Sequence, residues 1–401
     1  MDEDAHKSFF QYNPEFLKSG EHPQLFPLIF KRIPQTQVFS QFFNDSFRGL
    51  PSMIADSLPD AFGNTVFKTW LESKNKDMKH ISPLEQLAYV ANRGMGALEY
   101  QPAKSLPDSK QIEFQEIVEV LKLVLQNKSN AKGTKLNSKA LLNIFKIGSS
   151  AGGLRPKILI SEHKKNASII PGDLAIDNNY NHYLVKLNLE DNLLFPKELI
   201  EFSYYQTAIQ CGITMMSSKL IDSKHFATQR FDRQNGKKIH TLSASGISGW
   251  DYKDPEISSY EQLFKLASYL KIPYIEIEEL YRRMIFNLVF CNHDDHLKNH
   301  AFVYDEKQSA WHLSPAYDIT YSLNPELNFT QISRALSINE KRIHIELKDV
   351  LSIAETYTIK KAKRIIEEIQ DSIVVWEKNA MEIDIKKSSI KTLKKGFKRL
   401  L

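Results

Sequence analysis

Two carboxylates and one amide in the C-terminal third of the chain have the residue types and spacing that phosphoryl transfer needs. Asp294 precedes Asn299 by five positions, and Asp318 follows a short apolar run. Phosphoryl transfer requires a carboxylate beside the attacking hydroxyl and hard oxygen ligands for Mg²⁺. The spacing therefore predicts that Asp294 accepts the hydroxyl proton and that Asn299 and Asp318 hold the metal ion.

The D-x-x-x-x-N spacing is typical of the catalytic loop of protein kinases. So short a pattern also arises by chance. The stretch from residue 292 to residue 318 is rich in histidine and acidic residues, and an ordinary polar surface loop also explains it. The kinase interpretation therefore depends on further elements in the right chain order.

One upstream segment has the composition of a phosphate-binding loop. Small residues run from Gly148 to Gly153, and Arg155 and Lys157 add positive charge just before an apolar strand. Small residues let backbone N–H groups approach a phosphate closely. No Gly-Lys-Ser/Thr sequence closes the segment, so it is not a Walker A loop. An ordinary glycine-rich turn remains an equal alternative.

A lysine within a strand supplies the next element. Lys186 lies in the apolar run 183–187, where a charge is costly unless it has a partner. In kinases a strand lysine contacts the ATP phosphates and a helical glutamate holds it. The predicted helix 197–211 offers Glu198 and Glu201 for this role. The alternative is a lysine whose head group reaches solvent from the strand edge.

The overall composition is that of a globular protein. Of the 401 residues 42% are hydrophobic and 25% are charged, which excludes a disordered chain and predicts two or three packed units. Only Cys211 and Cys291 are present, so we expect a reducing compartment and no disulfide framework. No apolar run approaches the ~18 residues of a membrane span. We expect a cytoplasmic protein without membrane contact, and the net charge of +5 does not by itself indicate nucleic acid.

The hydrophobic pattern predicts the elements that carry these residues. Strands are expected at 158–161, 183–187, 219–221 and 312–316, a hairpin turn at 234–236, and helices within 117–125, 197–211, 257–291, 358–378 and the basic C-terminus. A polar linker ending at residue 137 separates an N-terminal subdomain (1–137) from a small nucleotide-binding lobe (138–235) and a helical catalytic lobe (236–401). The predicted fold class is α+β, with a bilobal protein-kinase-like core, a small N-terminal α+β subdomain and a largely helical C-terminal lobe.

Three longer motifs stand out in the chain: FRGLPSMIADSLPDAFGN from Phe47, RGMGALEY from Arg93 and GSSAGGLRPK from Gly148. Together they resemble one family, the HipA-like serine/threonine kinases, which are toxins of bacterial type II toxin–antitoxin systems. The resemblance extends from about residue 10 to about residue 350. Read without it, the first two motifs indicate only turns and helix starts.

The resemblance implies a role for each candidate residue. Asp294 matches the general base, Asn299 and Asp318 match the Mg²⁺ ligands, and His296 lies in the same catalytic loop near the phosphate. The implied ATP-binding residues, including the adenine-contacting segment at 229–231, are Lys186, Glu201, Gln229, Phe231, Ser150, Gly152, Gly153 and Lys157. Either Ser149 or Ser150 matches the loop serine that the family autophosphorylates.

The resemblance also implies cofactors and partners. ATP and Mg²⁺ are the expected cofactors, and the expected acceptor is a protein, which in known cases is an aminoacyl-tRNA synthetase. A helix-turn-helix antitoxin is the expected partner, with DNA contacted only through that complex. Two alternatives remain at this point: a small-molecule hydroxyl kinase, and a non-catalytic pseudokinase subunit of a DNA-bound repressor complex.

Two departures from the family pattern affect these expectations. The chain begins where most members already have one or two strands, so we expect an abbreviated or partner-completed N-terminal unit. The loop reads Gly-Gly-Leu-Arg-Pro-Lys from Gly152 to Lys157, where the best-known member has a Gln-Glu-Lys version. The choice between the two loop serines therefore stays open.

Overall fold

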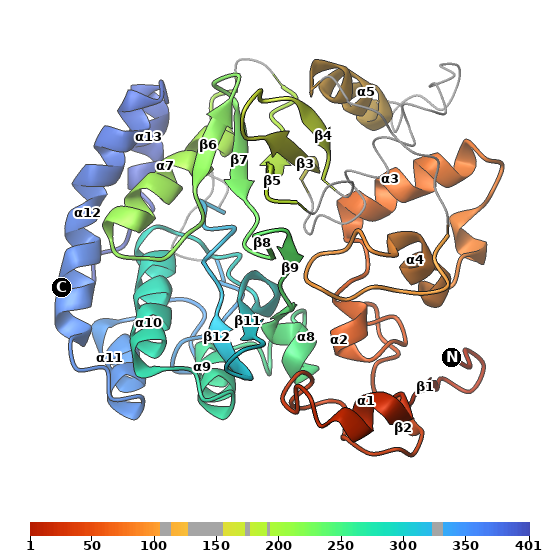
Figure 1. The fold of residues 1–401 in the computed structure, drawn as a ribbon. Coiled ribbons are helices and arrows are strands. Elements are labelled where there is room, and N and C mark those ends of the chain that lie inside the picture. The colour runs from red at the N-terminus through yellow and green to blue at the C-terminus, as the bar shows by residue number, and fades with distance from the viewer. Residues whose placement is uncertain (105–113, 127–154, 173–176, 191–192, 323–331) are drawn as a thin grey trace. The chain divides into compact units, whose positions relative to one another are not determined.

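The computed structural model describes residues 1–104, 114–126, 155–172, 177–190, 193–322 and 332–401 (Figure 1). The predicted loop residues Ser149, Ser150, Gly152 and Gly153 lie outside the described residues. The chain forms two compact units. The helical unit comprises Met1–Asp56, Asn192–Met216 and Thr241–Leu401, and the sheet unit comprises Ser57–Asp191 and Ser217–His240. The limits of these compact units differ from the predicted domain limits at residues 137 and 235. The division into domains at those two positions remains a prediction.

The sheet unit is built on a five-stranded antiparallel sheet with the order β4-β3-β5-β7-β6. Its strands are β3 (Lys157–His163), β4 (Ile169–Pro171), β5 (Tyr180–Lys186), β6 (Ser218–Ile221) and β7 (His225–Gln229). The three strands predicted at 158–161, 183–187 and 219–221 are thereby confirmed. Alternation along the strands places Ile158, Ile160 and Val185 in an apolar core, and Lys157 and Lys186 on the other face.

Helices pack against the apolar face of this sheet. They are α3 (Ala61–Glu72), η1 (Met78–His80), α4 (Pro83–Val90) and α5 (Phe114–Gln126). Asp60 caps α3 by accepting a hydrogen bond from the Gly63 N–H, and Ser82 with Glu85 forms a capping box on α4. The motif that begins at Phe47 indicated a helix start, and the structure confirms it at Asp60.

The predicted hairpin turn is also present. β8 (Arg233–Gln234) pairs with β9 (Lys237–Lys238) across Asn235 and Gly236. Both turn residues have positive φ, 49° and 70°, as a two-residue type I′ turn requires.

The helical unit contains most of the helices in the described part of the chain. They are α1 (Pro14–Ser19), α2 (Ser52–Ala55), α7 (Lys197–Gln210), α8 (Ala244–Ser248), α9 (Tyr260–Tyr269), α10 (Tyr274–Val289), η2 (Leu297–Asn299), α11 (Leu347–Thr356), α12 (Ala362–Glu382) and α13 (Lys387–Lys394). α12 packs against α7 and α10 (Figure 1). Trp376 of α12 and Tyr204 of α7 are fully buried, with their rings in edge contact. Among the helices described, none has the length and apolar character that crossing a bilayer requires.

Two small sheets complete the helical unit. β1 (Ser8–Phe10) pairs with β2 (Gln37–Phe39), and β10 (Thr241–Ser243), β11 (Ala301–Asp305) and β12 (Ala310–Leu313) form an antiparallel sheet. The strand predicted at 312–316 is wrong in its limits, because β12 ends at Leu313, two residues before Pro315, which has no N–H to donate. The helix predicted at 358–378 begins later, at Ala362, and continues to Glu382.

Candidate active site

The predicted catalytic loop is held at both ends by buried elements of the helical unit. α10 precedes it, and Cys291, with a left-handed φ of 57°, turns the chain out of the helix. The loop then passes through η2 into β11, which is the middle strand of its sheet. Leu297 is fully buried within the loop. A long helix and a central strand therefore fix the two ends of a short polar segment.

The two adjacent aspartates of the loop have opposite environments. The Asp294 side chain is 69% exposed, whereas the Asp295 side chain is fully buried. Asp295 accepts hydrogen bonds from the Tyr260 hydroxyl at 2.6 Å and from the Arg334 guanidinium. Of this pair, only Asp294 can present its carboxylate to an incoming hydroxyl group.

The orientation of the Asn299 side chain follows from a single contact. Its Nδ2 donates a hydrogen bond of 2.7 Å to the backbone carbonyl oxygen of Asp294. A carbonyl oxygen can only accept, so the amide nitrogen must face Asp294 and Oδ1 must face away from it. An amide oxygen set in this way is a suitable ligand for a hard cation.

The segment carrying Asp318 is tied to the same loop. The Tyr317 hydroxyl donates to the carbonyl oxygen of Lys298 at 2.8 Å. On the other side, the hydroxyl oxygen of Ser322 accepts from the N–H groups of His293 at 2.6 Å and Asp294 at 3.1 Å. Asp318 itself has a φ of 55°, a left-handed conformation uncommon outside glycine.

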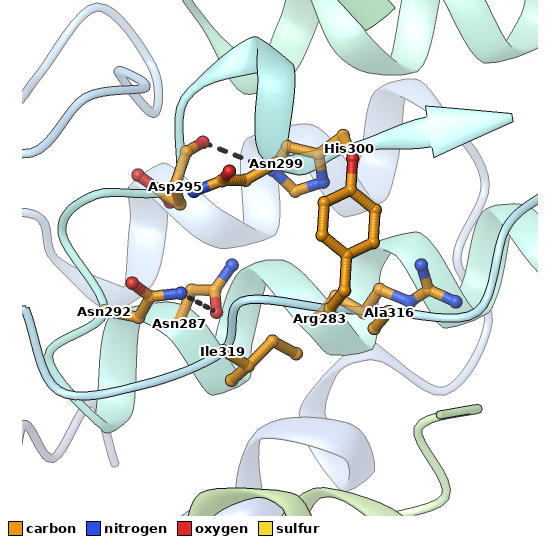
Figure 2. A pocket seen from close by; sticks show the side chains of 9 residues that line it. Arg283, Asn287, Asn292, Asp295, Asn299, His300, Ala316 and Ile319 are labelled. Atoms are coloured by element: carbon orange, nitrogen blue, oxygen red, sulfur yellow. Dashed lines mark hydrogen bonds between the residues drawn. The ribbon is translucent and has the colours of Figure 1, made fainter. Parts of the chain in front are cut away.

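A small polar pocket lies behind the loop (Figure 2). Its lining comes from α10, the loop and the segment around Asp318: Arg283, Asn287, Asn292, Asp295, Asn299, His300, Ala316, Tyr317 and Ile319. His300 donates from Nε2 to the carbonyl oxygen of Asp295, and burial lowers its pKa to about 4. His300 is therefore neutral at physiological pH and acts as a hydrogen-bonding wall of the pocket.

His296 lies beside the exposed carboxylate. Its Nε2 is 3.9 Å from Oδ1 of Asp294, and its ring is 5.0 Å from the ring of Tyr252. Among the described residues no cluster of three or more His, Cys, Asp or Glu side chains could hold a metal ion. The predicted ligand set, one amide oxygen and one carboxylate completed by substrate phosphates and water, does not require such a cluster.

The sheet unit carries the second group of predicted residues. Lys186 at the end of β5 is buried, and its cross-strand partner is Lys157. Nζ of Lys157 lies 3.8 Å from Oδ2 of Asp60, the capping residue of α3. Lys157 therefore has a carboxylate beside it within the same unit.

Gln229 and Phe231 flank a buried ion network. Both side chains are partly buried, while Arg230 and Arg233 contact Asp232 at 2.7 and 2.9 Å. Burial by itself raises the pKa of Asp232, but the two arginines outweigh it and lower the pKa to about 2.

The same network holds the glycine motif that begins at Arg93. The Gly96 N–H, at a residue with a φ of 74°, donates to Asp232, and the Arg233 guanidinium donates to the carbonyl oxygens of Gly94 and Gly96. The structural interpretation of this motif is confirmed.

Two known domains match this chain. The HipA N-terminal domain matches residues 1–101, and the HipA-like C-terminal domain matches residues 149–376, which is more than half of the chain. The chain belongs to the HipA family. The resemblance inferred from the three sequence motifs is thereby confirmed.

The sequence identity to an individual relative is low. The chain is 26% identical over 220 residues to "Putative kinase Y4dM" of Sinorhizobium fredii, a match that covers 49% of this chain and 51% of the relative. The chain thus spans about half the length of that relative.

The fold of this chain can be compared with solved structures. HipA of Shewanella oneidensis MR-1, solved with HipB and operator DNA, aligns with a TM-score of 0.64 at 16% identity, over 98% of this chain and 90% of that one. The Helicobacter pylori kinase CtkA aligns with a TM-score of only 0.35, at 13% identity, over 61% of this chain and 92% of that one. The likeness to HipA confirms the predicted α+β fold class with a kinase-like core.

Within this HipA-family fold the predicted site residues fall into two groups. The helical unit brings together Asp294, His296, Asn299 and the segment of Asp318, and it also carries the buried Glu201 on α7. The sheet unit carries Lys157, Lys186, Gln229 and Phe231. The binding and catalytic roles of all these residues remain predictions.

Sequence reasoning missed the groups that hold the loop from inside. Asp295, Tyr260 and Arg334 are distant in sequence, and no spacing pattern connects them. The one available signal was the pair of adjacent aspartates, since consecutive side chains of an extended chain point in opposite directions.

Proposed function

We propose that this chain is an ATP-dependent serine/threonine protein kinase. Asp294 accepts the proton of the acceptor hydroxyl. The hydroxyl oxygen of the acceptor bonds to the γ-phosphorus as the bond to ADP breaks. Asn299 and Asp318 hold Mg²⁺, which neutralises charge on the β- and γ-phosphates when it is bound. Lys186 contacts the phosphates, with Glu201 as its partner. Lys157, at the start of β3, and the loop residues Ser150, Gly152 and Gly153 also bind the phosphates, and Gln229 and Phe231 contact the adenine.

One observation supports this proposal most directly. The Asp294 side chain is exposed and can accept a proton. The amide nitrogen of Asn299 donates to the carbonyl oxygen of Asp294, so the amide oxygen of Asn299 points outward from the same loop. An inert polar loop would not need to fix the amide in that orientation. The geometry matches the two tasks that the loop must perform in phosphoryl transfer.

The proposal extends to the biological role. The Shewanella HipA structure contains HipB and operator DNA. By analogy we propose that this chain is the toxin of a type II toxin–antitoxin module in the bacterial cytoplasm. It would bind a helix-turn-helix antitoxin, contact DNA only through that complex, and phosphorylate a protein such as an aminoacyl-tRNA synthetase. Autophosphorylation at Ser149 or Ser150 would regulate it.

The test is phosphoryl transfer by the purified full-length chain. The protein is incubated with ATP, Mg²⁺ and a bacterial extract, and phosphopeptides and phosphorylated metabolites are identified by mass spectrometry. We expect phosphate on protein serine or threonine with wild type, and its loss with Asp294→Asn. Asp371→Asn, at an exposed position on α12, is the matched control and should behave as wild type.

Two results would contradict the proposal. Phosphorylated metabolites without any phosphoprotein would indicate a small-molecule kinase. Nucleotide binding without labelling of any protein, including the chain itself, would indicate a pseudokinase.

A further inference from the structure

A buried ion pair lies directly beneath the candidate base. The side chains of Asp295 and Arg334 are 0% and 1% exposed, and the Arg334 guanidinium donates to Oδ2 of Asp295. The same oxygen accepts from the Tyr260 hydroxyl, and Oδ1 accepts from the Leu336 N–H at 3.4 Å. Asp295 therefore has partners on both carboxylate oxygens.

The contacts extend from this pair to both sides of Asp294. Asn287 on α10 donates to the Tyr260 hydroxyl at 3.1 Å, and Asn292 donates to Oδ1 of Asn287 at 3.0 Å (Figure 2). The Ala335 N–H donates to the carbonyl oxygen of His293 at 2.7 Å. Helix α9, helix α10 and the segment containing Arg334 thus converge on the loop just before and just after the candidate base.

Burying such a pair is costly, because both ions lose hydration. Burial by itself raises the pKa of Asp295 and lowers that of Arg334. For each group the charge of its partner and the hydrogen bonds together outweigh burial, so the pKa of Asp295 is lowered, that of Arg334 is raised, and both groups are ionised at neutral pH. An apolar pair of similar volume would often be as stable. Stability alone therefore does not explain the ion pair, and we consider instead its effect on the geometry of the loop.

We propose that Asp295 and Arg334 are positioning residues for the phosphoryl-transfer site. Asp295 is adjacent to Asp294, so holding the inner carboxylate fixes the direction of the outer one. It also fixes the carbonyl oxygen of Asp294, to which the Asn299 amide is bonded. The pair sets the base and the proposed metal ligand together. This inference rests on the proposed kinase function.

The experiment compares three variants of the full-length chain. Arg334→Met removes one charge, the double variant Asp295→Leu/Arg334→Met replaces the pair by apolar side chains, and Lys341→Met breaks a different ion pair, with the buried Asp349, in the same unit. Melting temperature, kcat, the KM for ATP and hydrogen exchange of the amides at 292–300 are measured for each variant.

A positioning role predicts a separation between stability and turnover. Arg334→Met should lower kcat by about 100-fold, as expected for misplaced catalytic groups, with little change in the KM for ATP. Hydrogen exchange of the loop should become faster. The double variant should recover melting temperature but neither kcat nor loop protection, and Lys341→Met should lose melting temperature and keep kcat.

Two outcomes would overturn the inference. Recovery of kcat together with melting temperature in the double variant would leave the pair a purely structural role. An unchanged rate of hydrogen exchange at residues 292–300 in Arg334→Met would likewise show that the pair does not order the loop. Should wild type transfer no phosphate, the proposed function fails, and the exchange measurement still decides whether the pair orders the loop.

Discussion

Asp294 and Asp295 illustrate how environment divides two identical side chains between different tasks. The sequence spacing singled out Asp294 through its distance to Asn299, and it gave no reason why a second carboxylate should follow. The structure supplies the reason, since Asp295 faces a buried arginine and a tyrosine hydroxyl while Asp294 faces solvent. Burial and partners, which depend on the fold, could not be deduced from residue types alone.

This difference predicts that the same substitution has unequal effects on stability at the two positions. Asp294→Asn should change the free energy of unfolding by no more than about 0.5 kcal/mol, because the side chain is exposed. Asp295→Asn should cost about 3 kcal/mol, because it leaves the Arg334 charge buried without its counterion. Denaturant unfolding of both variants measures the two effects, and equal losses would contradict the assignment of surface and buried roles.

At the scale of elements, the sequence predicted those with a strong apolar period. α9, α10 and α12 each bury an apolar face, and β3 and β5 contain apolar runs, so these elements could be predicted from the sequence. The sheet formed by β10, β11 and β12 was not predicted as a unit, because its strands have three to five residues and β10 pairs with a strand 60 positions later. Neither its pairing nor its register is encoded in local periodicity.

The contact between the Gly94–Gly96 turn and the segment 230–233 was missed for the same reason. Both segments were singled out in the sequence, but the residues that join them lie 136 or more positions apart. Gln229 ends strand β7, and Phe231 lies between Arg230 and Asp232, which are both buried in this network. The network therefore stabilises the proposed adenine-contacting segment.

The network predicts a pH-dependent contribution to stability. The pKa of Asp232 falls from about 3.9 in the unfolded chain to about 2 in the fold, so its contribution of about 2 kcal/mol is present above pH 4. It is lost as the pH falls from 4 towards 2. The stability gap between wild type and Asp232→Asn, followed by denaturant unfolding, should narrow over that range. A gap that stays constant down to pH 2 would exclude this assignment.

At the scale of the whole molecule, each of the two compact units carries some of the residues proposed to bind the nucleotide. Asp294, Asn299 and Asp318 belong to the helical unit, and Lys186 belongs to the sheet unit. A ligand that binds only the folded protein stabilises it in proportion to the logarithm of its concentration. Nucleotide binding should therefore be visible as a change in thermal stability.

The expected result is a higher melting temperature with Mg²⁺ and ATP. At a ligand concentration of about 100 times Kd the stabilisation is about 2.7 kcal/mol. Lys186→Met keeps most of the buried volume of the side chain and removes its charge. Its melting temperature is therefore compared with and without ATP, and we expect the ATP-dependent increase to be lost. Lys341→Met, which removes an ion pair with Asp349 and no predicted ATP contact, should keep that increase. An undiminished increase in Lys186→Met would contradict the role of this lysine.

The most direct measurement is a structure of the full-length chain with Mg²⁺ and a non-hydrolysable ATP analogue. The account predicts Oδ1 of Asn299 and a carboxylate oxygen of Asp318 at about 2.1 Å from the metal ion, with Nζ of Lys186 in contact with the phosphates. A nucleotide bound at a different place would contradict the account. So would a structure in which Asn299 and Asp318 do not bind the metal ion and Lys186 does not contact a phosphate.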